Sequence, residues 1–136
     1  LKEGCLIAII HDRLDAMRMI LSKEAGGPGV IIAVATDNLH FAAYRGDHYV
    51  RAMLWAGADA AEPIKGGLAL ISTVCMGDVK SLCLLLRAGG SVEGSVDYWR
   101  NHLERGIYPP WTGVVTAEDK AARQARGLDF LAVVDA

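Results

Sequence analysis

Histidine and acidic side chains are the residues of this sequence most able to do acid–base or metal chemistry, and their spacing does not group them. His11 and Asp12 are adjacent in the chain, and adjacent residues on a helix do not face each other. His48 and His102 have no partner at a spacing typical of metal ligands. The sequence therefore predicts no metal site at these histidines.

Nucleophile and phosphate-binding motifs are also missing. The glycine-rich stretch at residues 26–29 lacks the preceding strand and the following Lys-Ser/Thr pair of a phosphate-binding loop. Cys5, Cys75 and Cys83 fit neither a zinc site nor a disulfide framework. Each lies among apolar residues, where free cysteine behaves as a small buried hydrophobe. We therefore expect three buried thiols, no cofactor and no enzyme.

Composition narrows the class of protein. Hydrophobic residues make up 52% of the 136 residues, enough for one buried core, so we expect a single domain over residues 1–136. The net charge is −2 without long runs of one sign, which predicts no nucleic-acid partner. The apolar runs are too short for membrane insertion.

The N-terminus and the cysteines bear on location. No basic segment followed by an apolar stretch marks a signal peptide, and free cysteines favour a reducing compartment. The chain begins with Leu1, which leads us to expect a part of a longer protein. We predict an intracellular protein, cytoplasmic or nuclear.

The elements that must position any site repeat along the chain. Each copy has a short apolar helix, a second helix and a glycine-containing turn. The first helices start at residues 5, 39 and 70, which are 34 and 31 residues apart. The copies comprise residues 5–11, 14–21 and 26–27, then 39–46, 49–54 and 57–59, and finally 70–77, 79–86 and 89–91.

Each copy predicts two antiparallel helices that bury one face by stacking on the next copy. Small residues at 42–43 and 73 indicate close approach of neighbouring first helices. The predicted buried faces of the second helices are Tyr49, Val50, Met53 and Leu54 in one copy and Val79, Leu82, Cys83 and Leu86 in the next.

This pattern resembles the ankyrin repeat family over roughly residues 3–93. Asp37-Asn38-Leu39-His40-Phe41-Ala42-Ala43 is similar to the family's Thr-Pro-Leu-His-x-Ala-Ala opening, and Gly57-Ala58-Asp59 matches its turn. Thr-Pro is absent, and Leu6 and Ile71 replace the histidine in the other copies. The resemblance implies an all-α, ankyrin-like solenoid of stacked antiparallel helix pairs. It also implies a structural hydrogen bond for His40.

The ends of the chain depart from the repeat. We expect a helix over residues 95–106 with Trp99 and Leu103 on one side, and an extended or turned segment around Pro109-Pro110. Thr116 and Asp119 resemble a capping box that starts a further helix, and residues 128–134 resemble the second helix of a degenerate repeat. The predicted organisation is repeats 3–36, 37–66 and 67–94, an insertion 95–115 and a capping repeat 116–136.

Two features stay open. The apolar stretch at residues 29–34 is unusual for a loop, and fits either a packed helical turn or strand, or an exposed contact. Trp99, Trp111, Tyr98 and Tyr108 gather with two arginines in the insertion. These residues fit either an anchor that holds the insertion on the stack or a partner-binding site. If the chain were an enzyme, we would expect its active-site pocket in this insertion.

The resemblance implies binding through the concave surface of the first helices and the loop tips before them. The positions that it maps onto this sequence are Phe41, Tyr44, Arg45, Ser72, Cys75 and Met76, the loop residues Asp37 and Asn38, and more weakly Ile7, Ile10 and His11. This composition is typical of protein interfaces. It predicts a protein-interaction module whose partner is another protein or a domain of the parent chain. The alternative is a docking or regulatory segment on a catalytic domain of that chain, with the surface covered by the parent protein or by the C-terminal segment.

Overall fold

The computed structural model describes residues 2–22, 28–106 and 116–136. Over these residues the regular structure consists of nine α-helices and no strands, which confirms the all-α prediction. The helices are α1 (Lys2–Ile10), α2 (Leu14–Ser22), α3 (Pro28–Asp37), α4 (Leu39–Arg45), α5 (Asp47–Trp55), α6 (Lys65–Met76), α7 (Val79–Arg87), α8 (Val96–Glu104) and α9 (Ala117–Asp135).

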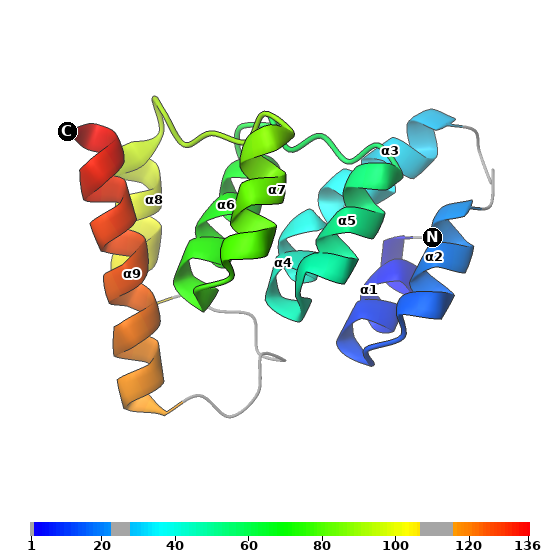
Figure 1. Cartoon of the computed structure of the whole chain (residues 1–136), viewed down its shortest axis with the longest axis horizontal. Coiled ribbons are helices and arrows are strands. Elements are labelled where there is room, and N and C mark those ends of the chain that lie inside the picture. The colour runs from blue at the N-terminus through cyan, green and yellow to red at the C-terminus, as the bar shows by residue number, and fades with distance from the viewer. Residues whose placement is uncertain (1, 23–27, 107–115) are drawn as a thin grey trace.

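The helices form a row of antiparallel pairs (Figure 1). Helix α1 packs on α2, α4 on α5, α6 on α7, and α8 on α9. Between the pairs, α4 contacts α1 and α6, and α6 contacts α9, while α5 lies between α2 and α7. The second helices α2, α5 and α7 therefore share one side of the row, nearest the viewer in Figure 1.

Small side chains let α4 and α6 pack closely, as predicted. Ala42 and Ala43 of α4 and Thr73 of α6 are buried. The Thr73 hydroxyl donates a hydrogen bond to the Leu70 carbonyl oxygen at 2.7 Å, so the polar group is satisfied in the core. The predicted buried face of α5, which packs on α4, is also confirmed. Its residues Tyr49, Val50 and Met53 are buried, and Leu54 is partly buried.

The buried face predicted for α7 is wrong. Val79 is 68% exposed, Cys83 is also exposed, and the buried residues are Ser81 and Leu85. Most residues of α7 are apolar, so more than one face fits the helical period. The short Ser81 side chain is accommodated because its hydroxyl donates to Asp78 Oδ2 at 2.5 Å. The expectation of three buried cysteines consequently holds for Cys5 and Cys75 but not for Cys83.

The apolar stretch at residues 29–34 forms most of α3 and packs with one face only, because Val30 and Ile32 are 40% and 42% exposed. Ile31, Val34 and Ala35 are buried, and α3 contacts α1, α4, α5 and α6. The turn after α5 meets this helix at Gly57. A Cβ there would lie 2.9 Å from Ile32 Cγ1, and the residue has φ 98°, so both space and backbone favour glycine.

The C-terminal pair differs from the predicted insertion and cap. Trp99 and Leu103 are buried on α8, as predicted, and Thr116 Oγ1 accepts a hydrogen bond from Asp119 N at 3.1 Å at the start of α9. Helix α9 then continues without a break, so the expectation of a separate second helix at residues 128–134 is wrong. Its partner in the pair is α8. The segment around Pro109-Pro110 lies outside the described residues.

No helix in the described ranges has both the length and the apolar character needed to cross a lipid bilayer.

Candidate functional site

Two residues of the predicted concave surface are buried, and the C-terminal helix packs on one of them, Cys75. Ser72 and Cys75 of α6 are each 1% exposed, so the prediction that they are accessible is wrong. Helix α9 packs on α6 at this place: a Cβ at Gly127 would lie 2.9 Å from Cys75 Sγ, and Arg126 Nε donates to the Cys75 carbonyl oxygen at 2.9 Å. Burial raises the pKa of Cys75 to about 11. The chain itself therefore covers this part of α6.

The predicted loop tips are not tips. Asp37 is the last residue of α3 and forms an ion pair with Lys65, while Asn38 is fully buried between α3 and α4. The Asn38 side-chain amide donates to the Val34 carbonyl oxygen at 3.0 Å. The expectation of exposed loop residues fails here because a helix occupies the segment that was expected to be a loop.

The remaining predicted positions lie on neighbouring first helices. Phe41 and Tyr44 of α4 and Met76 of α6 are partly buried, and the His40 ring lies beside that of Phe41 with centroids 3.8 Å apart. The structural hydrogen bond expected for His40 stays a prediction. On α1 and just after it, Ile7 and His11 are exposed and Ile10 is partly buried.

Arg45 has a structural role that the sequence did not predict. Its Nε donates to the Ile9 carbonyl oxygen at 2.8 Å, and its Nη2 donates to the carbonyl oxygen of Ile10. These carbonyls belong to the last turn of α1, whose backbone acceptors have no partner within the helix. The guanidinium therefore joins the second helix pair to the first.

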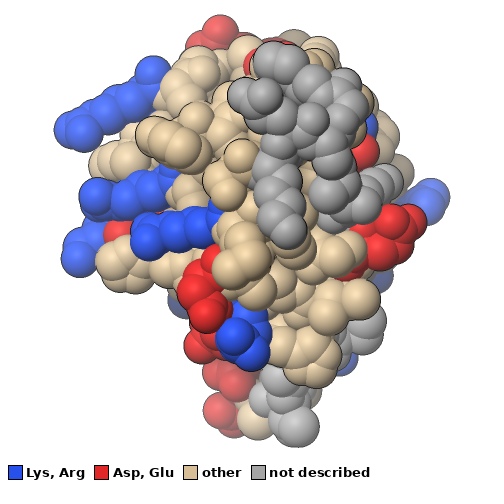
Figure 2. Space-filling view, turned by 90° about the vertical axis from the view of Figure 1, so that its right-hand side faces the viewer, with Lys and Arg blue, Asp and Glu red and all other residues tan. Residues whose placement is uncertain are grey.

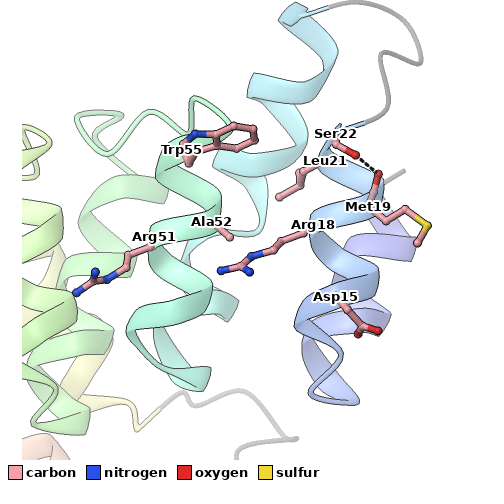
Figure 3. Close-up of a pocket in the computed structure, with 8 residues that line it drawn as sticks. All are labelled: Asp15, Arg18, Met19, Leu21, Ser22, Arg51, Ala52 and Trp55. Atoms are coloured by element: carbon pink, nitrogen blue, oxygen red, sulfur yellow. Dashed lines mark hydrogen bonds between the residues drawn. The ribbon is translucent and has the colours of Figure 1, made fainter.

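A hollow that the sequence analysis missed opens between the second helices α2 and α5 (Figure 3), and we name it the outer groove. Its volume is about 660 Å³, within the range of protein ligand sites. The residues that line it are Asp15, Arg18, Met19, Leu21 and Ser22 from α2, and Arg51, Ala52 and Trp55 from α5.

The floor of the outer groove is apolar and fixed by the core. Leu21 and Ala52 are nearly buried, and each belongs to a helix anchored by fully buried residues, Met17 in α2 and Val50 and Met53 in α5. Because Ala52 has a single methyl group, the space between the helices above it is left open. The groove is thus formed by two helices that are each anchored in the core, and it needs no loop to form it.

The rim combines an aromatic and a cationic side chain. Trp55, at the end of α5, is 82% exposed, and its indole extends from α5 toward α2 (Figure 3). The Arg18 side chain extends from α2 toward α5, whereas Arg51 points away from the gap. Tryptophan and arginine are enriched among the residues that dominate binding energy at protein interfaces.

The charges around the groove are unequally paired. Arg13 holds the Asp15 carboxylate through two hydrogen bonds of 3.2 Å, which lowers the pKa of that carboxyl. Arg51 Nε lies 3.4 Å from Asp47 Oδ2. Arg18 forms no hydrogen bond or ion pair with any residue in the described ranges. The groove consequently holds one arginine whose charge is not matched.

Basic residues continue along the same side of the molecule. Figure 2 views the α1–α2 end of the row, and Lys and Arg side chains gather on its left, the side of the second helices. The exposed basic residues of α2, α5 and α7 are Arg18, Arg51, Lys80 and Arg87.

The aromatic cluster of the predicted insertion is only partly described. Trp99 is buried, its Nε1 donates to Ser95 Oγ at 3.1 Å, and its ring meets those of Tyr98 and His102 edge-on. This agrees with an anchoring role for Trp99. Burial lowers the pKa of His102. Tyr108 and Trp111 lie outside the described residues.

Among the residues with a described position, no three of His, Cys, Asp and Glu gather as metal ligands.

Comparisons with protein-family models, with curated proteins and with solved structures found no match to this chain.

Proposed function

We propose that this chain is a protein-interaction module, an ankyrin-like stack of helix pairs that holds a segment of a partner protein in the outer groove. The observation that carries the proposal is the exposed Trp55 at the rim of a preformed groove with an apolar floor. Isolated exposed apolar residues are ordinary, but an aromatic residue beside a concave apolar surface marks an interaction site.

The ankyrin-like interpretation is supported by the order of parts in the second and third pairs. Each has a helix that ends at a glycine, Gly46 or Gly77, then a second helix and a turn containing Gly57 or Gly89. The pairs pack first helix on first helix and second on second. Helix α3 is the main departure, because it fills a connection that the family resemblance would leave as a loop.

The rigidity of the groove favours binding. Its residues lie on two helices that are anchored in the core, so no loop must become ordered when a partner arrives. The concave surface is a weaker candidate than the sequence indicated, because Ser72, Cys75 and Asn38 are buried within the chain. We therefore place the site on the second helices.

The test is affinity capture from a lysate of the cells that produce the protein, with three baits matched for thermal stability. These are the wild type, a Trp55→Ala variant and a Tyr98→Ala control, which removes another exposed aromatic residue at the far end of the row. We expect partners that wild type and Tyr98→Ala retain and that Trp55→Ala loses. Retention of the same partners by all three baits would remove the outer groove as the site, and no retention by wild type would contradict the proposed function.

A further inference from the structure

The outer groove also carries information about the chemistry of its occupant. We infer that it binds an acidic segment of a partner protein, in which an Asp or Glu lies within a few residues of a bulky apolar side chain. This inference rests on the proposed function of the same groove and adds the class of sequence that the groove recognises.

Arg18 supplies the site for the carboxylate. Asp15 lies one turn before Arg18 on α2 and would be its natural ion-pair partner. The Asp15 carboxylate is instead held by both Arg13 nitrogens, Nε and Nη2. Arg18 is left without a partner in the described part of the chain and extends into the gap between the helices. A guanidinium in this state offers its paired donors to an incoming carboxylate.

The apolar surface of the groove supplies the second half of the site. Leu21 and Ala52 form the floor, and the Trp55 indole stands beside it. A leucine, methionine or phenylalanine placed on this floor would bury apolar area against all three residues, which stabilises binding by about 25 cal/mol per Å². Arg18 enters the gap from α2 and Trp55 stands on α5 at the same groove (Figure 3), so we expect one short segment of the partner to carry both the carboxylate and the apolar side chain.

The basic surface around the outer groove also favours an acidic partner segment. The exposed basic residues of the second helices are Arg18, Arg51, Lys80 and Arg87, and Asp15 of the groove lining and Asp47 of α5 each have an arginine partner. The whole chain has a net charge of −2, so this basic side is a local feature. It attracts acidic segments and repels basic ones during association.

The experiment is a selection of random displayed peptides on the immobilised wild-type chain, followed by a comparison on Trp55→Ala. Peptides that wild type retains and Trp55→Ala loses are groove binders. We expect them to be enriched in Asp or Glu near Leu, Met or Phe. One such peptide is synthesised, and its dissociation constant is measured for wild type, Arg18→Glu and the control Arg105→Glu, which reverses an exposed arginine at the end of α8.

Arg18→Glu should weaken binding about tenfold or more, whereas Arg105→Glu should leave it within about twofold. Replacement of the acidic residue of the peptide by Lys should restore binding to Arg18→Glu and abolish binding to wild type. Rising salt should weaken the wild-type complex, because exposed charge pairs are screened.

Three outcomes would overturn the inference. Groove binders without acidic preference, or with basic preference, would contradict it while leaving the proposed function intact. A wild-type protein that is dimeric, with Trp55→Ala monomeric, would show that a second copy of the chain fills the groove. If no peptide distinguishes wild type from Trp55→Ala, the groove is not a peptide site, and the proposed function fails together with the inference.

Discussion

Arg45 in α4 donates a hydrogen bond from Nε to the carbonyl oxygen of Ile9 in the last turn of α1, at 2.8 Å. The two residues are thirty-six positions apart, and the bond ties the second helix pair to the first. A cation at this place also complements the negative end of the helix dipole. The other end of the row repeats the arrangement, since Arg126 of α9 donates to the Cys75 carbonyl oxygen in the last turn of α6 at 2.9 Å.

Replacement of Arg45 by alanine should therefore destabilise the fold. The carbonyl oxygens of Ile9 and Ile10 lose a charged donor, and the expected decrease in the free energy of unfolding is about 1–3 kcal/mol. Urea denaturation followed by circular dichroism measures it. Arg51→Ala is the matched control, because that arginine makes a surface ion pair with Asp47 worth about 0–1 kcal/mol. Equal effects of the two substitutions would contradict the structural role of Arg45.

Tyr49 forms a second link between the same pairs, and its contribution should depend on pH. The Tyr49 hydroxyl donates to Asp12 Oδ1 at 2.5 Å, and burial together with this hydrogen bond raises the pKa of Tyr49 to about 12. Because the folded state favours the protonated phenol, the stabilisation is fully present below the ordinary pKa of 10.0 and is lost as the pH rises toward 12.

Tyr49→Phe should lower the free energy of unfolding by about 1.5 kcal/mol near neutral pH, since it removes a hydrogen bond to a charged acceptor. The difference between wild type and Tyr49→Phe should then shrink as the pH rises through 10 toward 12. Denaturation curves at several pH values test this. A difference that stays constant over that interval would show that the phenol proton does not contribute.

The sequence predicted the helix pairs well because their signals are local. Apolar periodicity and the glycine turns placed α4, α5 and α7, and Thr116 correctly marked the start of α9, whereas α6 begins at Lys65, before the predicted start at residue 70. The face predicted for α7 is wrong because six of its nine residues are apolar, so the period did not distinguish Leu85 from Leu86. Which of these leucines is buried depends on the neighbouring helices α5 and α6, and such contacts are not encoded in one segment.

The candidate site was harder to predict for the same reason. Arg18 and Trp55 lie on separate helices, and nothing in their spacing indicates that they line the same groove. One signal was present: Trp55 is a large aromatic residue outside the apolar face of its helix. The family resemblance directed attention to the first helices instead, where Ser72 and Cys75 are buried and α9 packs on Cys75.

The approach of α8 to α6 depends on a glycine. A Cβ at Gly67 would lie 2.8 Å from Trp99 Cζ2, and the indole cannot move away easily because it is buried and bonded to Ser95. Gly67→Ala should lower the free energy of unfolding by about 1–3 kcal/mol. Gly29→Ala is the control: no atom lies within 4 Å of its Cβ, and it should leave stability unchanged or raise it by up to about 1 kcal/mol. Thermal denaturation separates the two, and an unchanged midpoint for Gly67→Ala would contradict the close contact with Trp99.

The three cysteines should differ sharply in reactivity. Cys83 is exposed on α7, whereas Cys5 and Cys75 are buried and burial raises the pKa of each to about 11. Alkylation requires both access and the thiolate. Iodoacetamide at neutral pH should therefore modify only Cys83 in the folded protein and all three cysteines in denaturant, as mass spectrometry of proteolytic fragments can show.

Cys83→Ser gives the matched control for this experiment, because the folded variant should remain unmodified while the denatured variant takes two labels. The result also tests the corrected face of α7. If Cys83 were on the buried face that periodicity indicated, native wild type would resist modification at all three positions. Modification of Cys75 at the rate of Cys83 would instead show that α9 does not cover α6 in solution. In that case the concave surface would again be accessible to a partner.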